Sequence, residues 1–219
     1  MAYSFTSASS QYLSVSPVPV PASALPLTMA CWFRASSATA SISRVLMAAA
    51  DSNGSGFYRL VIPANTTVLR ANTTGDNGIG ASADTAANSV AANTWIHGAA
   101  VYSSTTLRTV YISTSTAVSS TASVTAPTIN NFYIGAGWQT PSGVGLFFDG
   151  LLAESGVWRA ALTADEIASL ARGVSPSLVR PQSLAFYAPL IRELADARGG
   201  ASLTNNGGAT VANHPRVYA

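Results

Sequence analysis

Few side chains in this 219-residue sequence have the chemistry for acid–base catalysis: nine carboxylates and two histidines. A retaining glycosidase holds two carboxyl groups close together beside the sugar. The carboxylates nearest to that arrangement are Asp149 and Glu154, which lie in one strand-like run. Their odd spacing of five residues places them on opposite faces of a regular strand. The sequence therefore argues against glycoside hydrolysis.

The histidines offer no better basis for catalysis. His97 lies in an apolar strand-like run, and His214 precedes a proline, so neither is placed like the general base of a Ser-His-Asp triad. Glu193 and Asp196 have helical spacing and are typical of a solvated face. The single cysteine, Cys31, has apolar neighbours, as buried structural cysteines do. The sequence contains no phosphate loop, nucleophile elbow or Cys/His cluster, so we expect no enzyme and no catalytic residue.

Two segments carry oxygen ligands of the kind that calcium prefers, Asp51-Ser52-Asn53-Gly54 and Asp76-Asn77-Gly78. Each is also a strong turn signal, because Asp and Asn hydrogen-bond the nearby backbone and Gly supplies positive φ angles. The aspartates are spread along the whole sequence, which disfavours a site built from several carboxylates. We expect turns here and leave calcium open as the only cofactor.

One segment has the chemistry to contact a sugar. Trp138 and Gln139 lie in a Gly- and Pro-rich stretch, where an indole could stack on a sugar ring beside a polar amide. Asp76 and Asn77 could add polar contacts from a neighbouring turn. These four residues are the candidate glycan contacts. The alternative is that Trp138 covers one end of the core, since buried aromatic side chains contribute strongly to core packing.

The composition excludes several classes of partner. Charged residues make up only 9% of the sequence, all the basic residues are Arg, and the formal net charge is +2. This scattered charge cannot supply the phosphate contacts that nucleic-acid binding requires. The sequence has neither a signal-peptide pattern nor an apolar run long enough for a membrane helix. We expect no nucleic-acid or membrane partner, and synthesis in a cytoplasm without a signal peptide.

Alternating polar and apolar residues, rich in β-branched and aromatic types, recur at short intervals and predict an all-β fold. Residues 94–102 have two faces. Trp95, His97, Ala99 and Val101 share one face, and Ile96, Ala100 and Tyr102 share the other. Both faces are apolar, so we expect this strand in the middle of a layered structure or beneath a covering segment. The predicted strands span residues 11–15, 27–34, 44–50, 57–62, 67–71, 94–102, 107–114, 131–136 and 146–158.

One short helix is predicted near residues 163–172. Thr163 and Glu166 have the spacing of a capping box, and Ile167 and Leu170 form an apolar stripe before Gly173. We expect residues 1–219 to form a single domain. Residues 176–219 are a C-terminal extension that either adds late strands or docks on a partner.

Residues 149–167 carry a distinctive series: a glycine, a strand that ends in an aromatic residue, an Ala-Leu-Thr step and a helix with an acidic first turn. This series resembles the closing signature of concanavalin A-like, laminin G-like domains. Residues 3–5, 11–15, 93–102 and 107–112 agree with other strands of that family, so the resemblance spans roughly residues 3–173. Where the family often has Asp-Gly, this sequence has Ser113-Thr114.

The resemblance implies an antiparallel jelly-roll β-sandwich whose rim loops bind glycans or proteins in many relatives, and calcium in some. Residues 175–190 and 213–218 are similar to laminin G-like proteins of tailed bacteriophages. The first hypothesis is therefore a virion structural protein, such as a capsid decoration on the virion surface, with the major capsid protein as partner and a multivalent or homo-oligomeric arrangement. The second hypothesis is a carbohydrate-binding, lectin-like module.

Overall fold

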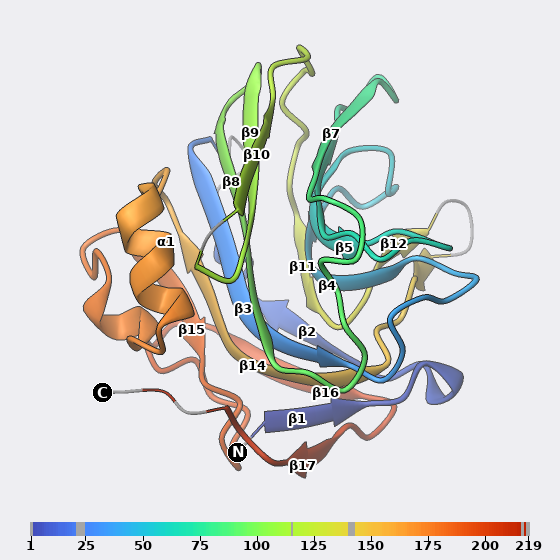
Figure 1. Cartoon of the computed structure of the whole chain (residues 1–219), viewed down its shortest axis with the longest axis vertical. Coiled ribbons are helices and arrows are strands. Elements are labelled where there is room, and N and C mark those ends of the chain that lie inside the picture. Colours follow the sequence, from blue (N-terminus) through green and yellow to red (C-terminus); the bar gives the residue numbers. More distant parts are fainter. Residues whose placement is uncertain (1, 21–24, 115, 140–142, 216, 218–219) are drawn as a thin grey trace.

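The computed structural model describes residues 2–20, 25–114, 116–139, 143–215 and 217. Two antiparallel sheets face each other and form a jelly-roll sandwich (Figure 1), as predicted. The eight-stranded sheet has the order β10 (Thr116–Ser120), β9 (Leu107–Ile112), β8 (Ile96–Ser104), β3 (Leu27–Ala35), β14 (Gly150–Trp158), β1 (Ala2–Phe5), β17 (Thr210–Ala212), and β15 (Leu184–Ala188) also pairs with β14. The seven-stranded sheet has the order β16 (Ser202–Asn206), β2 (Tyr12–Ser16), β11 (Asn131–Ile134), β4 (Arg44–Ala50), β5 (Phe57–Ile62), β6 (Arg70–Thr74), β7 (Gly80–Asp84).

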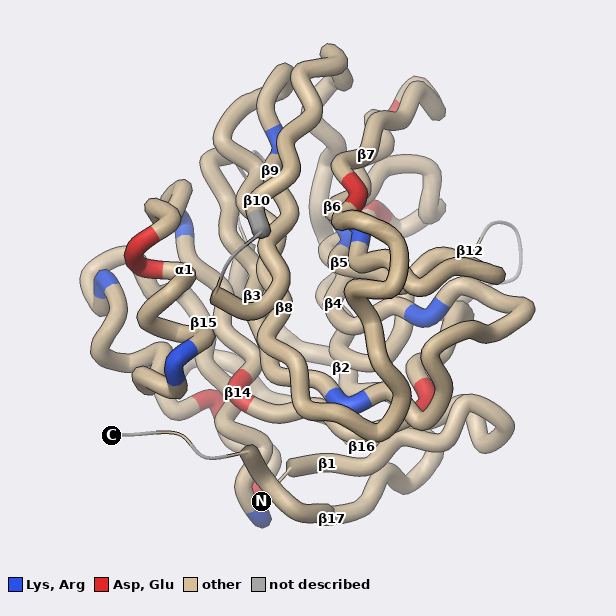
Figure 2. The backbone as a smooth tube through the Cα atoms, in the orientation of Figure 1, with Lys and Arg blue, Asp and Glu red and all other residues tan. Residues whose placement is uncertain are grey.

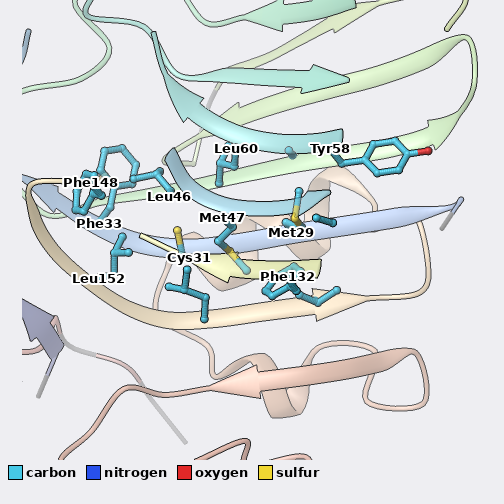
Figure 3. Close-up of a cluster of buried hydrophobic side chains, with 14 of the residues drawn as sticks. Met29, Cys31, Phe33, Leu46, Met47, Tyr58, Leu60, Phe132, Phe148 and Leu152 are labelled. Atoms are coloured by element: carbon cyan, nitrogen blue, oxygen red, sulfur yellow. The ribbon is translucent and has the colours of Figure 1, made fainter. Parts of the chain in front are cut away.

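The main core fills the space between the two sheets (Figure 3). Cys31 and Phe33 of β3 meet Met47 of β4 and Phe132 of β11 there, and all four side chains are buried. Alternate residues of each strand supply this layer because successive side chains point to opposite faces. Burial of this apolar surface is the main force that holds the two sheets together.

The outer face of the eight-stranded sheet is covered as well. Helix α1 (Ala164–Ala171) lies against it (Figure 1), and Ile167 and Leu170 join Ala99 and Val101 of β8 in a second buried cluster. Ile96 belongs to the main core instead. The prediction that both faces of this strand are covered is therefore confirmed.

The start of α1 also follows the sequence prediction. The Thr163 hydroxyl accepts from the backbone N–H of Glu166, and the Glu166 carboxylate accepts from the backbone N–H of Thr163 at 2.7 Å. This reciprocal pair satisfies two N–H groups that the first helical turn leaves free.

Residues 176–219 contribute three strands to the sandwich. β15 extends the eight-stranded sheet beside β14, β16 pairs with β2 at an edge of the seven-stranded sheet, and β17 pairs with β1. The first and last strands therefore lie side by side (Figure 1). A short 3₁₀ turn (Pro176–Leu178) leads into this part of the chain, and another (Ser7–Ser9) joins β1 to β2.

Some strand boundaries differ from the prediction. β11 ends at Ile134 because Gly135 has a φ of +80°. Residues 146–149 were predicted as the start of a strand, but Leu146 adopts a φ of +55° and the strand begins at Gly150. β6 begins at Arg70, three residues later than predicted. The sequence did not predict the edge strands β7 and β10, nor the small hairpin of β12 (Gly137–Gln139) and β13 (Gly143–Gly145).

Charged residues are few and scattered along the described backbone (Figure 2). The described side chains form two bidentate Arg–carboxylate pairs, one between Arg70 and Asp84 and one between Arg180 and Glu166. Among the described residues, no helix has the length and apolar character needed to cross a membrane.

Candidate functional site

The hairpin of β12 and β13 lies against the outer face of the seven-stranded sheet. Gly137 makes this close approach possible, because a Cβ there would lie 3.0 Å from Val45 Cγ2 and 3.3 Å from Arg59 Nε. Arg59 also fastens the hairpin, since its guanidinium donates to the carbonyl of Trp138. Burial lowers the pKa of Arg59 to about 10, and its guanidinium lies 3.4 Å from the centre of the Phe57 ring.

Gln139 and Trp138 lie on different sides of this hairpin, as neighbouring residues of a strand do. Gln139 is exposed and lines a groove, and its amide oxygen passes over Gly145, where a Cβ would lie only 2.8 Å away. The half-buried Trp138 ring lies against Gly54, and a Cβ on that glycine would overlap the indole. The two side chains, which the sequence predicted as neighbouring glycan contacts, therefore lie on different sides of the hairpin.

The groove beside Gln139, here called the hairpin groove, has a volume of about 570 Å³. Four segments form it: the β1–β2 connection, the β3–β4 loop, the β12–β13 hairpin and the turn before β14. Its walls combine hydroxyl, amide and carboxylate groups with aliphatic and aromatic side chains. The lining residues are Ser7, Ala8, Ser36, Ser37, Ala40, Ser41, Ile42, Arg44, Gln139, Val144, Gly145, Leu146, Phe147 and Asp149.

One cation and one anion organise the loops around the hairpin groove. Arg44 is buried and donates to the carbonyls of Ser37 and Ala38, which fixes the β3–β4 loop. Burial lowers the pKa of Arg44, and the charge of Asp149 partly offsets that effect. The Asp149 carboxylate accepts from the Ser36 hydroxyl and, at 3.3 Å, from a backbone N–H of the β1–β2 connection.

An aromatic cluster supports one wall. The Phe147 ring lies 5.9 Å from the Tyr12 ring, and Tyr12 makes an edge-on contact with Tyr133 at the same distance. Phe147 is half-buried, so part of the ring faces the groove. The groove thus offers an apolar surface next to hydrogen-bonding groups, which is typical of small-molecule sites.

The sequence did not predict Arg44, Phe147 or Asp149 as groove residues, because all three lay in or beside predicted strands. One signal was available. Phe147, Phe148, Asp149 and Gly150 form an apolar pair followed by a turn pair, which is typical of a chain that leaves one surface and enters a strand.

The two candidate calcium segments form turns. The Asp76 carboxylate accepts from the backbone N–H of Thr128 at 3.1 Å and from its hydroxyl at 2.9 Å. Asn77 accepts from the N–H of Ile79. Asp51 similarly accepts from the backbone N–H groups of Asn53 and Gly56. The turn interpretation is confirmed, and within the described residues no group of three His, Cys, Asp or Glu side chains could hold a metal ion.

Asp76 and Trp138 lie on either side of the 51–56 loop. Gly54 touches Trp138, and a Cβ on Gly56 would lie 2.2 Å from Asp76 Oδ1. None of Asp76, Asn77 and Trp138 is among the residues that line the hairpin groove. Their role as a separate glycan-binding rim stays a prediction.

The two carboxylates weighed for glycoside hydrolysis lie on different surfaces. Asp149 lines the hairpin groove, whereas Glu154 is buried among residues of the outer face of the eight-stranded sheet, beside Trp32 and His97. This pair therefore does not provide the close carboxylates of a retaining mechanism.

Residues 7–168 match the family model described as the concanavalin A-like lectin/glucanases superfamily. No curated protein matches the sequence. Among solved structures, a candidate carbohydrate-binding protein from Bacteroides ovatus is 22% identical, with a TM-score of 0.64; the match covers 95% of this chain and 58% of that one. This chain thus spans somewhat more than half of the Bacteroides protein.

Two further structures share the fold. The heptameric SAP-like pentraxin from Limulus polyphemus is 14% identical, with a TM-score of 0.64 and coverage of 95% of this chain and 93% of that one. The CBM40 of the Ruminococcus gnavus IT-sialidase is 15% identical, with a TM-score of 0.56 and coverage of 68% and 84%. The same CBM40 has also been solved with α2,3-sialyllactose bound.

Proposed function

We propose that this chain, which belongs to the concanavalin A-like lectin/glucanase superfamily, binds carbohydrate in the hairpin groove and does so without catalysis. The observation that carries the proposal is the composition of the groove. Phe147 offers an aromatic surface for the C–H face of a sugar ring, while Gln139 and Asp149 offer an amide and a carboxylate for its hydroxyl groups. The carbohydrate-binding descriptions of the Bacteroides and Ruminococcus structures support the same function.

The virion role predicted from the sequence receives no support from these comparisons. The three structures described above are two carbohydrate-related proteins and a pentraxin. The comparisons therefore favour the second sequence-based hypothesis over the first. A capsid decoration that also bound glycans would contradict neither the fold nor the groove.

The groove favours a neutral ligand. Ser36, Ser37 and Ser41 supply hydroxyl groups, and the single Arg and the single Asp balance in charge. Arg44 already donates to two carbonyls, so its guanidinium is poorly placed to pair with an acidic sugar. We expect hexose- or pentose-based neutral oligosaccharides to bind better than sialylated or uronic acid-containing ones.

A glycan array probed with a multivalent form of the full chain tests the proposal, followed by calorimetric titration of the best ligand. Gln139→Ala is expected to weaken binding about five- to thirtyfold, because one lost hydrogen bond to a buried hydroxyl costs about 1–2 kcal/mol. Gln182→Ala, an exposed glutamine outside the groove, is the matched control and should leave affinity unchanged.

The same titration distinguishes binding in the hairpin groove from binding at the rim around Trp138. If Trp138→Ala abolished binding while Gln139→Ala and Ile42→Asp had no effect, the ligand would bind at the rim and the groove proposal would be wrong. Ile42 is a suitable probe because its side chain lines the groove and is 61% exposed, so the substitution should not disturb the core. The absence of binding to any neutral glycan would overturn the proposed function itself.

A further inference from the structure

A second pocket lies on the outer face of the eight-stranded sheet, away from the hairpin groove. Trp32 of β3, His97 of β8, and Glu154 and Trp158 of β14 line it. Val217, from the segment that follows β17, lies among the same residues. The pocket has no room for a water molecule. Residues 213–215 together with Val217 are called the His–Pro segment below.

A β-bulge brings Glu154 to this pocket. β14 and β3 pair regularly up to Ala153 opposite Trp32, and pairing resumes with Gly156 opposite Ala30. Two residues of β14 therefore face Cys31 alone, and Glu154 adopts a φ of +53°. Such a conformation is costly for a residue with a side chain, and bulges often redirect side chains at binding sites.

The Glu154 carboxylate is 3% exposed and has two partners. The Tyr187 hydroxyl donates to Oε2 at 2.5 Å, and His214 Nε2 lies 2.8 Å from Oε1. A buried carboxylate is strongly destabilising without a counter-charge. Burial, together with the neighbouring Glu154, raises the pKa of Tyr187, so this phenol stays neutral. Of the described basic side chains, His214 is the one within ion-pair distance of Glu154.

Two acceptors lie beside the His214 ring. Its Nδ1 lies 2.6 Å from the carbonyl oxygen of Pro215. Its Nε2 lies 2.8 Å from Glu154 Oε1, within ion-pair distance but without hydrogen-bond geometry. The His214 side chain is 11% exposed and Pro215 is buried, so these residues pack into the protein and do not merely lie across its surface.

His97 adds a polar atom to the pocket that makes no hydrogen bond with the His–Pro segment. The side chain is 2% exposed and its Nδ1 has no hydrogen-bond partner. The Trp32 ring meets it edge-on at 5.6 Å. Burial lowers the pKa of His97 to about 3, so the ring is neutral and does not repel a cation nearby. Within the described structure, the pocket therefore combines one anion, two indoles and a spare polar nitrogen.

We propose that this pocket is a peptide-binding site, that it recognises a basic side chain followed by proline and, two residues after the proline, an aliphatic residue, and that the His–Pro segment of this chain is its tethered occupant. Tethering makes the local concentration of the segment high, so even a weak intrinsic affinity keeps the pocket filled. The site is independent of the hairpin groove and of the carbohydrate proposal, because the two share no lining residue.

Hydrogen–deuterium exchange of the full chain, read by mass spectrometry, tests the seating of the segment. His214→Ala and Glu154→Gln are each expected to increase exchange of the Asn213, His214 and Val217 amides, where each is present, at least tenfold. Asn213→Ala, which changes an exposed neighbour, is the control and should leave exchange unchanged. If both pocket variants exchange like the wild type while near-ultraviolet circular dichroism confirms their fold, the proposal is wrong.

Binding in trans tests recognition. A synthetic peptide of residues 209–217 should bind the His214→Ala protein measurably by calorimetry, and the wild type at least tenfold more weakly, because the wild-type pocket is filled. The same peptide with alanine in place of its histidine should bind the variant at least tenfold more weakly. Equal binding of the two peptides, or no binding of either, would overturn the site.

Discussion

Glu166 joins a helix start to a distant segment. Its carboxylate caps α1 through the backbone N–H of Thr163, and it accepts two hydrogen bonds from Arg180 at 2.8 and 2.6 Å. Partial burial opposes the charge, but the Thr163 N–H and the Arg180 guanidinium together lower the pKa of Glu166. The cap therefore also holds the segment after α1, which carries Arg180, against the helix.

Glu166→Gln should lower the free energy of unfolding by up to about 1 kcal/mol at pH 7, the usual scale of a partly exposed ion pair, because the Gln amide oxygen can still accept from the Thr163 N–H. A carboxyl group with a lowered pKa stabilises the fold above its ordinary pKa, and the effect is lost as the pH falls through the lowered value. The difference between wild type and variant in urea denaturation should thus shrink below about pH 4. A difference that stayed constant down to pH 2 would contradict the charge-based explanation.

The pKa of His97 is also lowered, but by burial and not by hydrogen bonds. Full burial lowers its pKa to about 3, so the folded protein holds the ring neutral while the unfolded chain binds a proton below about pH 6.5. Stability contributed in this way is present at neutral pH and is lost on acidification.

We expect the free energy of unfolding to fall by about 1.4 kcal/mol per pH unit between pH 6 and 4 on account of His97. His97→Gln removes this titration, so its stability should depend less steeply on pH. Urea denaturation of both proteins at matched pH values measures the difference. Parallel profiles would show that His97 takes up its proton without unfolding.

At the scale of elements, β14 connects the features that matter for function. Asp149, the residue just before β14, lines the hairpin groove. The bulge in β14 turns Glu154 towards the second pocket. Trp158, the last residue of β14, donates to the Val179 carbonyl at 2.8 Å. The bulge also keeps Leu152 and Val157 in the same core despite an odd spacing of five residues. One irregular pair of residues therefore serves both the core and a binding surface.

Gly156 permits the close packing that follows this bulge. A Cβ there would lie 2.5 Å from Trp158 Cη2 and 2.7 Å from Cζ3, and the ring is fully buried. Gly156→Ala should lower the free energy of unfolding by about 1–3 kcal/mol, the cost of overpacking. Gly145→Ala is the matched control, because its new Cβ would lie 2.8 Å from Gln139 Oε1, the end of a flexible exposed side chain, and 3.3 Å from Gln139 Cβ, with no buried ring nearby among the three closest atoms. Equal melting temperatures for the two variants would refute the packing argument.

At the scale of the whole molecule, the sandwich separates its two candidate binding surfaces. The hairpin groove lies at loops beside the seven-stranded sheet, and the peptide pocket lies on the outer face of the eight-stranded sheet. The core between the sheets isolates one from the other, and Cys31 lies inside it (Figure 3). Burial raises the pKa of the Cys31 thiol, which suppresses the reactive thiolate.

Cys31 should therefore report global unfolding. We expect maleimide labelling of Cys31 to be negligible in the native protein and to rise in the same urea range as the change in tryptophan fluorescence, because the thiol becomes accessible only when the sheets separate. Labelling well below that range would show that the sandwich opens locally. Cys31→Ser serves as the blank for nonspecific reaction.

The sequence by itself determined the features that depend on local chemistry. Alternation of side chains predicted most of the strands, the Thr163–Glu166 spacing predicted the helix cap, and Asp-Asn-Gly composition predicted the turns. These signals are readable because the residues that interact are close in sequence. The family resemblance then supplied the jelly-roll arrangement, which local patterns do not specify.

Only the tertiary structure decided the sites. Edge strand β7, with the sequence Gly-Ala-Ser-Ala-Asp, has weak strand propensity and exists because β6 pairs with it. Whether Trp138 and Gln139 share a face depends on a hairpin that the sequence did not predict. The contact of His214 with Glu154 joins residues 60 positions apart and needs the bulge in β14. Such contacts depend on how distant segments pack, and the residues around each one carry no local signal of it.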